Sequence, residues 1–591
     1  ITQFSYLYEM KNYTFLFILV LSLIFPFSSL PQNNPAEHQK AIEYLDSKGE
    51  VYFSFEVFDK ARVNELSLVI SIDKVSGCTV FAYANRSEFE KFSMLDIPYT
   101  VLPHPGDADV DLNMQSDPRS VMEWDAYPTY EAYVAMMNQF ATSYPGLCRI
   151  VNAGATIQGR QILFAVISDT VQTPQPEPKV MYTSSMHGDE TTGYVLMLRL
   201  INYLLTQYGT NSKITQLVNN SEIWINPLAN PDGTYRTGNS TVTGAIRNNA
   251  NGYDLNRNYP GVDAPNTAPL QPETILFMNL AGQNYFRLSA NFHGGTEVLN
   301  YPWDSWSRLS ADDAWWQRVC RKYADTVHLY APANYMNEYV NGITNGYAWY
   351  YVRGSRQDYQ IYYRHGREVT IEISDTKLLP AAQLPAHWDY NYRSLINYLE
   401  QAQYGINGWV RDSLTNLPLK AKVTITGFDM DSSEVYSDST FGKYYRMLIA
   451  GTYNLTFSAP GYYSKTVQNV ASNNDQATVV NVLLRPIPTG LAEEPAIPVS
   501  FKLYQNFPNP FNPMTNIKFD VPVTQQQSGK ENVVLKIYNI LGKELTTLVN
   551  DQLSPGTYEV NFDGTNYPSG IYYCRMSFGE SATVNKMILL K

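Results

Sequence analysis

Cysteine is scarce in this 591-residue chain, which has only Cys78, Cys148, Cys320 and Cys574. No two of them form a CxxC pair, and this absence excludes zinc-finger and thioredoxin-like sites. Cys148 and Cys320 fall in one predicted domain. They would form a disulfide in an oxidising compartment or remain as buried thiols, and the spacing favours neither alternative.

Charge is also limited. Charged residues make up 17%, the formal net charge is −12, and no long basic run occurs. Nucleic acid and anionic membrane surfaces are therefore excluded as expected partners. Hydrophobic residues make up 44%, which is enough for globular cores. The length predicts several domains, and the 46 tyrosines are typical of β-rich ones.

Long apolar runs are absent except near the N-terminus, from Phe15 to Phe25. About 20 apolar residues are needed to span a membrane, so this run is too short. It follows Met10-Lys11 and precedes small residues, as in a signal peptide. We therefore predict a signal peptide region at 1–31 with Met10 as the start. An N-terminal anchor is the alternative.

Pattern changes along the chain predict an α/β domain between smaller units. Residues 32–103 read as a β-α-β-β-α-β unit, with strands at 51–57, 68–72, 79–84 and 99–102 and helices at 60–65 and 87–95. A linker at 104–122 leads into 123–404. There strands at 180–184, 222–225, 288–292 and 368–373 alternate with helices at 130–144, 190–208 and 386–403, which predicts a mixed or mostly parallel sheet.

Two all-β sandwiches are expected after the α/β domain. The first covers 405–485, with strands such as 421–426 and 452–458. A proline-rich linker at 486–500 leads to the second, 501–591, with strands at 516–521, 533–538, 556–562 and 570–578.

A candidate metal site begins with His187 and Glu190, which directly follow a predicted strand. Imidazole and carboxylate ligands suit zinc, and a catalytic zinc commonly has three protein ligands. His293 is the candidate third ligand because it ends another predicted strand, where open α/β folds place their sites. Each residue alone also fits an ordinary surface or buried position.

Two further sequence motifs contain residues suited to binding and hydrolysing a peptide. Asp254-Leu255-Asn256-Arg257-Asn258-Tyr259-Pro260 offers an arginine fork and an amide for a free carboxylate, and Arg247 would stabilise an oxyanion. Glu372 stands among apolar strand residues. A carboxylate there needs a partner or a purpose, such as taking a proton from an activated water.

Together the HGDE, DLNRNYP, NFHGG and EVTIEIS strings resemble the zinc carboxypeptidase family typified by pancreatic carboxypeptidases A and B. They look most like the regulatory N/E subgroup, which includes carboxypeptidases D, E, M and N. The likeness covers residues 125–403. It continues into 405–485, which is similar to the transthyretin-like domain of that subgroup.

The resemblance implies a role for each matched residue. His187, Glu190 and His293 would bind one Zn²⁺, with Asp254 behind a zinc-bound imidazole. Glu372 would be the general base and acid, and Arg247 would polarise the scissile carbonyl. Asn256 and Arg257 would hold the substrate's terminal carboxylate. A mobile tyrosine of the family aligns with Tyr350, with Tyr351 as the alternative. Asp304 would favour basic C-terminal residues.

The flanking units resemble known modules too. The element order of 32–103 is similar to a carboxypeptidase activation domain, which implies either a cover over the active site or a folding aid. The tail from Tyr504-Gln505-Asn506-Phe507 onward resembles the C-terminal sorting domain of type IX secretion substrates. That implies export across both membranes of a Gram-negative bacterium by the type IX machinery.

The sequence therefore predicts a secreted zinc carboxypeptidase that acts on peptides or proteins with a free C-terminus. Two alternatives remain: a catalytically silent peptide-binding protein on the same fold, and a zinc peptidase that acts on cell-wall peptides.

Overall fold

The computed structural model describes residues 35–488, 498, 500–522, 531–579 and 581–591. The predicted signal peptide region and most of the linker at 486–500 lie outside these residues. The chain divides into two compact units on either side of Pro486, and each is described by itself. Within the described ranges, no helix combines the length and the apolar character needed to cross a bilayer.

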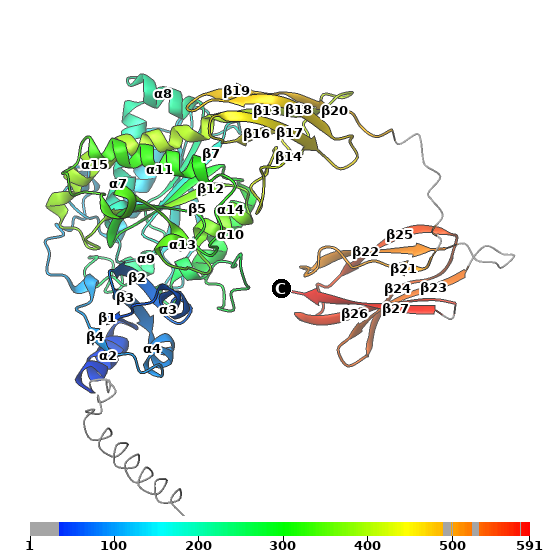
Figure 1. Ribbon diagram of the computed structural model, residues 1–591, viewed down its shortest axis with the longest axis horizontal. Coiled ribbons are helices and arrows are strands. Elements are labelled where there is room, and N and C mark those ends of the chain that lie inside the picture. Colours follow the sequence, from blue (N-terminus) through cyan, green and yellow to red (C-terminus); the bar gives the residue numbers. More distant parts are fainter. Residues whose placement is uncertain (1–34, 489–497, 499, 523–530, 580) are drawn as a thin grey trace, which may run out of the picture. The chain divides into compact units, whose positions relative to one another are not determined.

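The N-terminal part has the predicted element order, in a four-stranded sheet ordered β2-β3-β1-β4 (Figure 1). The elements are α2 (Pro35–Ser47), β1 (Glu50–Glu56), α3 (Lys60–Leu66), β2 (Ser71–Ser76), β3 (Thr79–Asn85), α4 (Arg86–Ser93) and β4 (Tyr99–Val101). Helix α2 was not predicted. The strand predicted at 68–72 starts only at Ser71, because the N–H groups of Val69 and Ile70 both bond to the carbonyl of Leu66 and close a turn.

An eight-stranded mixed sheet forms the centre of the α/β part, in the order β11-β10-β12-β9-β7-β8-β6-β5. Its strands are β5 (Cys148–Ala155), β6 (Gln161–Ile167), β7 (Lys179–Ser184), β8 (Glu222–Asn226), β9 (Leu288–His293), β10 (Thr296–Tyr301), β11 (Ile343–Asn345) and β12 (Arg367–Ser374). The inner strands β12, β9, β7 and β8 run parallel, within the mixed or mostly parallel sheet predicted from the alternation of strands and helices.

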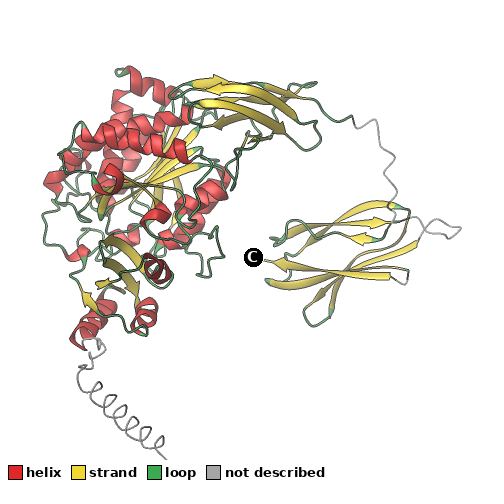
Figure 2. Ribbon diagram, in the orientation of Figure 1, coloured by secondary structure: helices red, strands yellow, loops and turns green. Residues whose placement is uncertain are grey.

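Helices cover both faces of this sheet (Figure 2). They include α6 (Tyr130–Ser143), α7 (Thr192–Gln207), α8 (Ser212–Asn219), α10 (Pro272–Gln283), α11 (Asp313–His328), α14 (Arg356–Tyr362) and α15 (Leu384–Glu400). The side chains of strand β6 show why helices are needed on both faces of the sheet. Leu163 and Ile167 pack into the core with α7, α11 and α15, whereas Phe164 and Val166 pack into the core with α10. Alternate side chains thus feed two hydrophobic cores.

The remaining strands form paired sheets. Residues 405–484 contribute β13 (Gly405–Asp412), β14 (Lys422–Ile425), β15 (Val435–Tyr436), β16 (Lys443–Arg446), β17 (Gly451–Ser458), β18 (Lys465–Ser472), β19 (Ala477–Val479) and β20 (Val482–Leu484). The C-terminal unit contributes β21 (Lys502–Leu503), β22 (Met514–Val521), β23 (Glu531–Asn539), β24 (Glu544–Leu553), β25 (Gly556–Asp563), β26 (Gly570–Phe578) and β27 (Ser581–Leu589). Each set encloses its own apolar core.

All four cysteines are free, so no disulfide joins Cys148 to Cys320. Both are buried, Cys148 in strand β5 and Cys320 in helix α11. Of the two alternatives that the sequence allowed, buried thiols describe the structure.

Candidate metal centre

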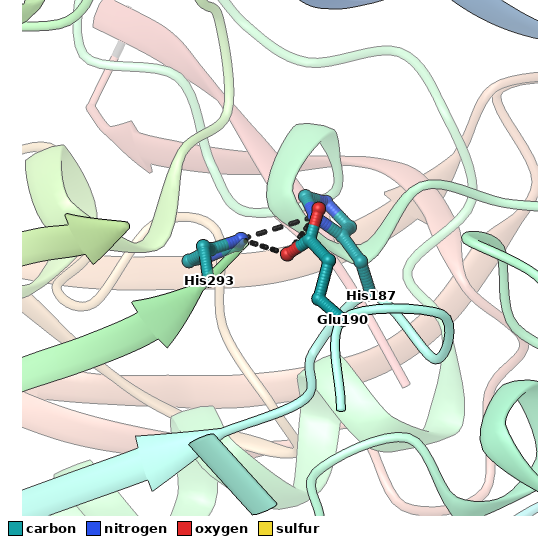
Figure 3. A group of neighbouring side chains, drawn as sticks. All are labelled: His187, Glu190 and His293. Carbon is teal, nitrogen blue, oxygen red and sulfur yellow. Dashed lines mark hydrogen bonds and ion pairs between the residues drawn. The ribbon is translucent and has the colours of Figure 1, made fainter. Parts of the chain in front are cut away.

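Three side chains converge on one point, as Figure 3 shows: His187, Glu190 and His293. The Nδ1 atoms of the two imidazoles lie 3.0 Å apart. A carboxylate oxygen of Glu190 lies 2.8 Å from His293 Nδ1 and 3.0 Å from His187 Nδ1. All three side chains are almost completely buried. Three electron-pair donors that point at one another in this way form a cation site.

The sheet positions these ligands. His187 and Glu190 lie in the turn between β7 and α7, and His293 is the last residue of β9. Strands β7 and β9 are parallel neighbours, so their carboxyl ends meet at one edge of the sheet. Glu372 pairs with His293 in the next parallel strand, β12. The four residues predicted from separate strings therefore meet at the carboxyl ends of three adjacent strands.

The donor set fits zinc. Bonds of about 2.1 Å in tetrahedral geometry place ligand atoms roughly 3.4 Å apart, and these donors lie slightly closer, at 2.8–3.0 Å. Burial lowers the pKa of His293 to about 4, which keeps its imidazole in the neutral form that binds metals. Two imidazoles and one carboxylate leave a fourth position for water or substrate.

Asp254 and Arg247 support the centre from one side. Asp254 Oδ1 lies 3.0 Å from His187 Nε2, and this contact orients the imidazole so that Nδ1 faces the other ligands. Arg247 Nε donates to Asp254 Oδ2 at 3.1 Å, and its Nη1 lies 3.3 Å from Glu190. Asp254 also caps the short helix at Leu255–Arg257 by accepting the N–H of Asn256.

Glu372 faces the same small cavity as the three metal-ligand candidates. Its carboxyl is buried, and its Oε2 has no hydrogen-bond partner among the described residues. Burial, followed by the nearby charge of Glu190, raises the pKa of Glu372 well above its ordinary value. A buried carboxyl with an oxygen that makes no structural hydrogen bond has the character of a proton acceptor and donor.

The two residues expected to bind a terminal carboxylate, Asn256 and Arg257, line this cavity too, and so does Tyr350, the tyrosine expected to close over the substrate. Asn256 Oδ1 accepts the N–H of Arg356 at 3.0 Å, so its amide nitrogen is the group left to donate. The alternative tyrosine, Tyr351, does not line the cavity, and its hydroxyl donates to Asp263 at 2.6 Å.

Asp304 forms another part of the cavity wall. Its Oδ1 accepts hydrogen bonds from Asn300 at 3.0 Å and from Gln357 at 3.1 Å. It packs closely under Gly346, where a Cβ would lie 2.0 Å from that oxygen. Sequence reasoning missed Gln357. It lies in α14 next to Asp358, whose carboxylate accepts the backbone N–H of Asp304.

Two charged residues in the centre were also missed, Lys377 and Asp73. Lys377 Nζ donates to Glu190 at 2.8 Å and to Asp73 at 2.8 Å. Burial alone lowers the pKa of Lys377, but the carboxylates of Asp189, Asp73 and Glu190 outweigh it and raise that pKa well above its ordinary value. Lys377 follows Glu372 by five positions, and Asp73 belongs to the N-terminal β2, so no local pattern links them.

Comparison with known proteins shows the family to which this chain belongs. Residues 133–394 match the zinc carboxypeptidase model. The chain is 32% identical over 399 residues to the carboxypeptidase N catalytic chain of Homo sapiens, across 86% of that protein and 61% of this chain. The chain belongs to the zinc carboxypeptidase family. Zinc is accordingly the metal that His187, Glu190 and His293 fit, and the predicted fold class is confirmed.

Two other relatives agree. Carboxypeptidase M of Mus musculus is 32% identical over 363 residues, which is 57% of this chain and 79% of that protein. Carboxypeptidase D of Mus musculus is 36% identical over 374 residues, or 61% of this chain. The chain spans about a quarter (26%) of the length of that carboxypeptidase D.

The tail has its own match. Residues 505–590 match a secretion system C-terminal sorting domain. This confirms the sorting module predicted from the Tyr504-Gln505-Asn506-Phe507 string, and it places the protein at the cell surface or outside the cell through type IX secretion. The likeness of residues 405–485 to a transthyretin-like domain stays a prediction.

Proposed function

We propose that the protein is a zinc-dependent carboxypeptidase that removes the C-terminal residue of peptides. The observation that carries this proposal is the buried Glu372 in one cavity with His187, Glu190 and His293, with a carboxylate oxygen that finds no hydrogen-bond partner in the described part of the chain. A silent peptide-binding protein would have no need to retain such a costly carboxyl.

The chemistry that bound Zn²⁺ supplies is polarisation of a carbonyl and activation of a water. Glu372 accepts a proton from the attacking water and passes it to the nitrogen of the leaving residue. Arg247 lies beside the ligands with its guanidinium directed at Glu190, where it stabilises the negative charge that develops on the scissile carbonyl oxygen. Asp254 keeps the His187 imidazole and the Arg247 guanidinium in place.

Substrate recognition follows from the rest of the cavity. The Arg257 guanidinium and the Asn256 amide donate to the terminal carboxylate, and Tyr350 closes over the residue to be removed. Asp304 offers a buried carboxylate, flanked by the amides of Asn300 and Gln357, to the side chain of that residue. A buried anion favours a cationic partner, so we infer a preference for C-terminal arginine or lysine.

We also infer that the N-terminal unit closes this site. Its strand β2 inserts Asp73 between Arg247 and Lys377, at 3.1 and 2.8 Å, while Arg257 donates to the carbonyl of Ile72 at 3.0 Å. The cavity that remains holds about 30 Å³, which is room for water and not for an amino-acid residue. Substrate access thus requires β2 to move away.

One assay tests these proposals together. Hippuryl peptides that end in arginine, lysine, phenylalanine or glutamate are offered to the chain before and after it is cut between residues 104 and 120, where Arg119 is exposed. We expect zinc-dependent release of arginine and lysine, abolished by a chelator and faster after the cut. No release from any peptide would favour the silent binding protein. A matched set of peptides that end in D-amino acids is offered in parallel, and cleavage of that set alone would favour a cell-wall substrate.

A further inference from the structure

Two buried cations in the metal centre share one anion that comes from outside the α/β part. Asp73 Oδ1 lies 2.8 Å from Lys377 Nζ and 3.1 Å from Arg247 Nη1. All three side chains are at most 5% exposed. Tyr52 adds a hydroxyl 3.3 Å from the other oxygen of Asp73. Together, these contacts form a buried binding site for a carboxylate.

This anion site differs from the one assigned to the terminal carboxylate. Among the described residues, Asp73 forms no hydrogen bond with Asn256 or Arg257. Arg257 instead binds the carbonyl oxygen of Ile72. Adjacent residues of β2 therefore occupy two sites at once, with a backbone oxygen at Arg257 and a side-chain carboxylate at Lys377.

Lys377 loses its outside partner when β2 leaves. Its remaining contacts are Glu190 Oε1 at 2.8 Å and the carbonyl of Gly294 at 3.3 Å. With zinc bound, Glu190 would share its charge with the metal and would compensate Lys377 only in part. An ammonium in a desolvated cleft then needs a new anion, and the substrate is the group that enters the cleft.

We propose that Lys377 and Arg247 select peptides with an acidic side chain on the residue before the scissile bond, and that Asp73 is the intramolecular stand-in for that side chain. The inference rests on the proposed function. In such a peptide, the terminal carboxylate at Arg257 and the acidic side chain at Lys377 come from adjacent residues, as the two groups of β2 do, although the chain direction is reversed. In the proposed function Arg247 faces the scissile carbonyl between these two residues, which puts the acidic residue on the acyl side.

The test compares two N-acylated dipeptides, one ending in Glu-Arg and one in Gln-Arg, on the full chain folded with zinc and then cut between residues 104 and 120. They differ only in one charge. We expect kcat/KM to be roughly tenfold higher for Glu-Arg, as a charge-assisted hydrogen bond predicts. Lys377→Met should bring the ratio near one, while Lys377→Arg, the matched control, should keep most of it. Zinc content is measured for each variant.

Equal rates on both dipeptides, or an unchanged ratio in Lys377→Met, would overturn this inference and leave the proposed carboxypeptidase intact. Failure to cleave either dipeptide would overturn the proposed function and this inference with it. If Lys377→Met loses zinc, the wild-type ratio at rising ionic strength decides: a charge-based preference falls with salt, and a shape-based preference does not.

Discussion

Asp73→Asn is expected to activate the full-length chain. The substitution keeps the size of the side chain and removes the charge that holds Arg247 and Lys377. Both ion pairs are buried, with side chains at most 5% exposed, so solvent screens them little. Loss of the carboxylate therefore weakens the contact of β2 with the metal centre and leaves the fold of the N-terminal unit unchanged.

The size of the effect follows from these contacts. Charge-assisted hydrogen bonds contribute about 1.5–3 kcal/mol each, and Asp73 makes two of them at 3.1 and 2.8 Å. The amide oxygen of asparagine recovers part of this energy, so the net loss is about 3 kcal/mol. At 1.4 kcal/mol per factor of ten, the ratio of open to closed molecules rises roughly a hundredfold.

The assay is the initial rate of arginine release by full-length protein at low substrate, measured before and after the cut at 104–120. Asp73→Asn should raise the rate before the cut and leave the rate after it close to that of wild type. The control is Asp96→Asn, the same chemical change at an exposed position of the same unit. Full activity of uncut wild type, or an uncut Asp73→Asn as slow as uncut wild type, would refute the reasoning.

The remaining predictions concern single groups. Glu372→Gln should keep bound zinc and lose activity by at least about a hundredfold, since it removes the general base; near-normal turnover would contradict that role. Asp304→Asn should lower kcat/KM for C-terminal arginine and spare C-terminal phenylalanine, so an equal loss on both would argue against a contact with basic side chains. Burial raises the pKa of Glu88 from 4.5 to about 7, so folding favours its protonated form. The N-terminal unit should therefore lose stability as pH rises from 4.5 through 7, and Glu88→Gln should flatten that part of the profile in proteolysis or hydrogen-exchange measurements.

Much of the metal centre could be predicted from sequence because its residues stand at recognisable places. His187, Glu190 and His293 follow apolar strand segments, and Glu372 interrupts one. Parallel strands bring their carboxyl ends together, so these local signals were enough to place the four side chains at one edge of the sheet.

Lys377, Asp73 and Gln357 could not be predicted in the same way. Lysine and aspartate are usually exposed, and nothing near Lys377 or Asp73 in the sequence indicates burial. Their contact joins residues 304 positions apart and depends on how β2 packs against the α/β part. The late start of β2 was missed for a related reason, because Leu68 and Val69 are apolar enough for a strand but continue the turn after α3.

The most direct measurement is the zinc content of the purified chain, in wild type and in His293→Ala, by elemental analysis after dialysis against metal-free buffer. The convergence of His187, Glu190 and His293 predicts one zinc per wild-type chain and little zinc in the variant, because one of three protein ligands is lost. A variant that retained a full equivalent of zinc, or a wild type that bound none, would contradict the account.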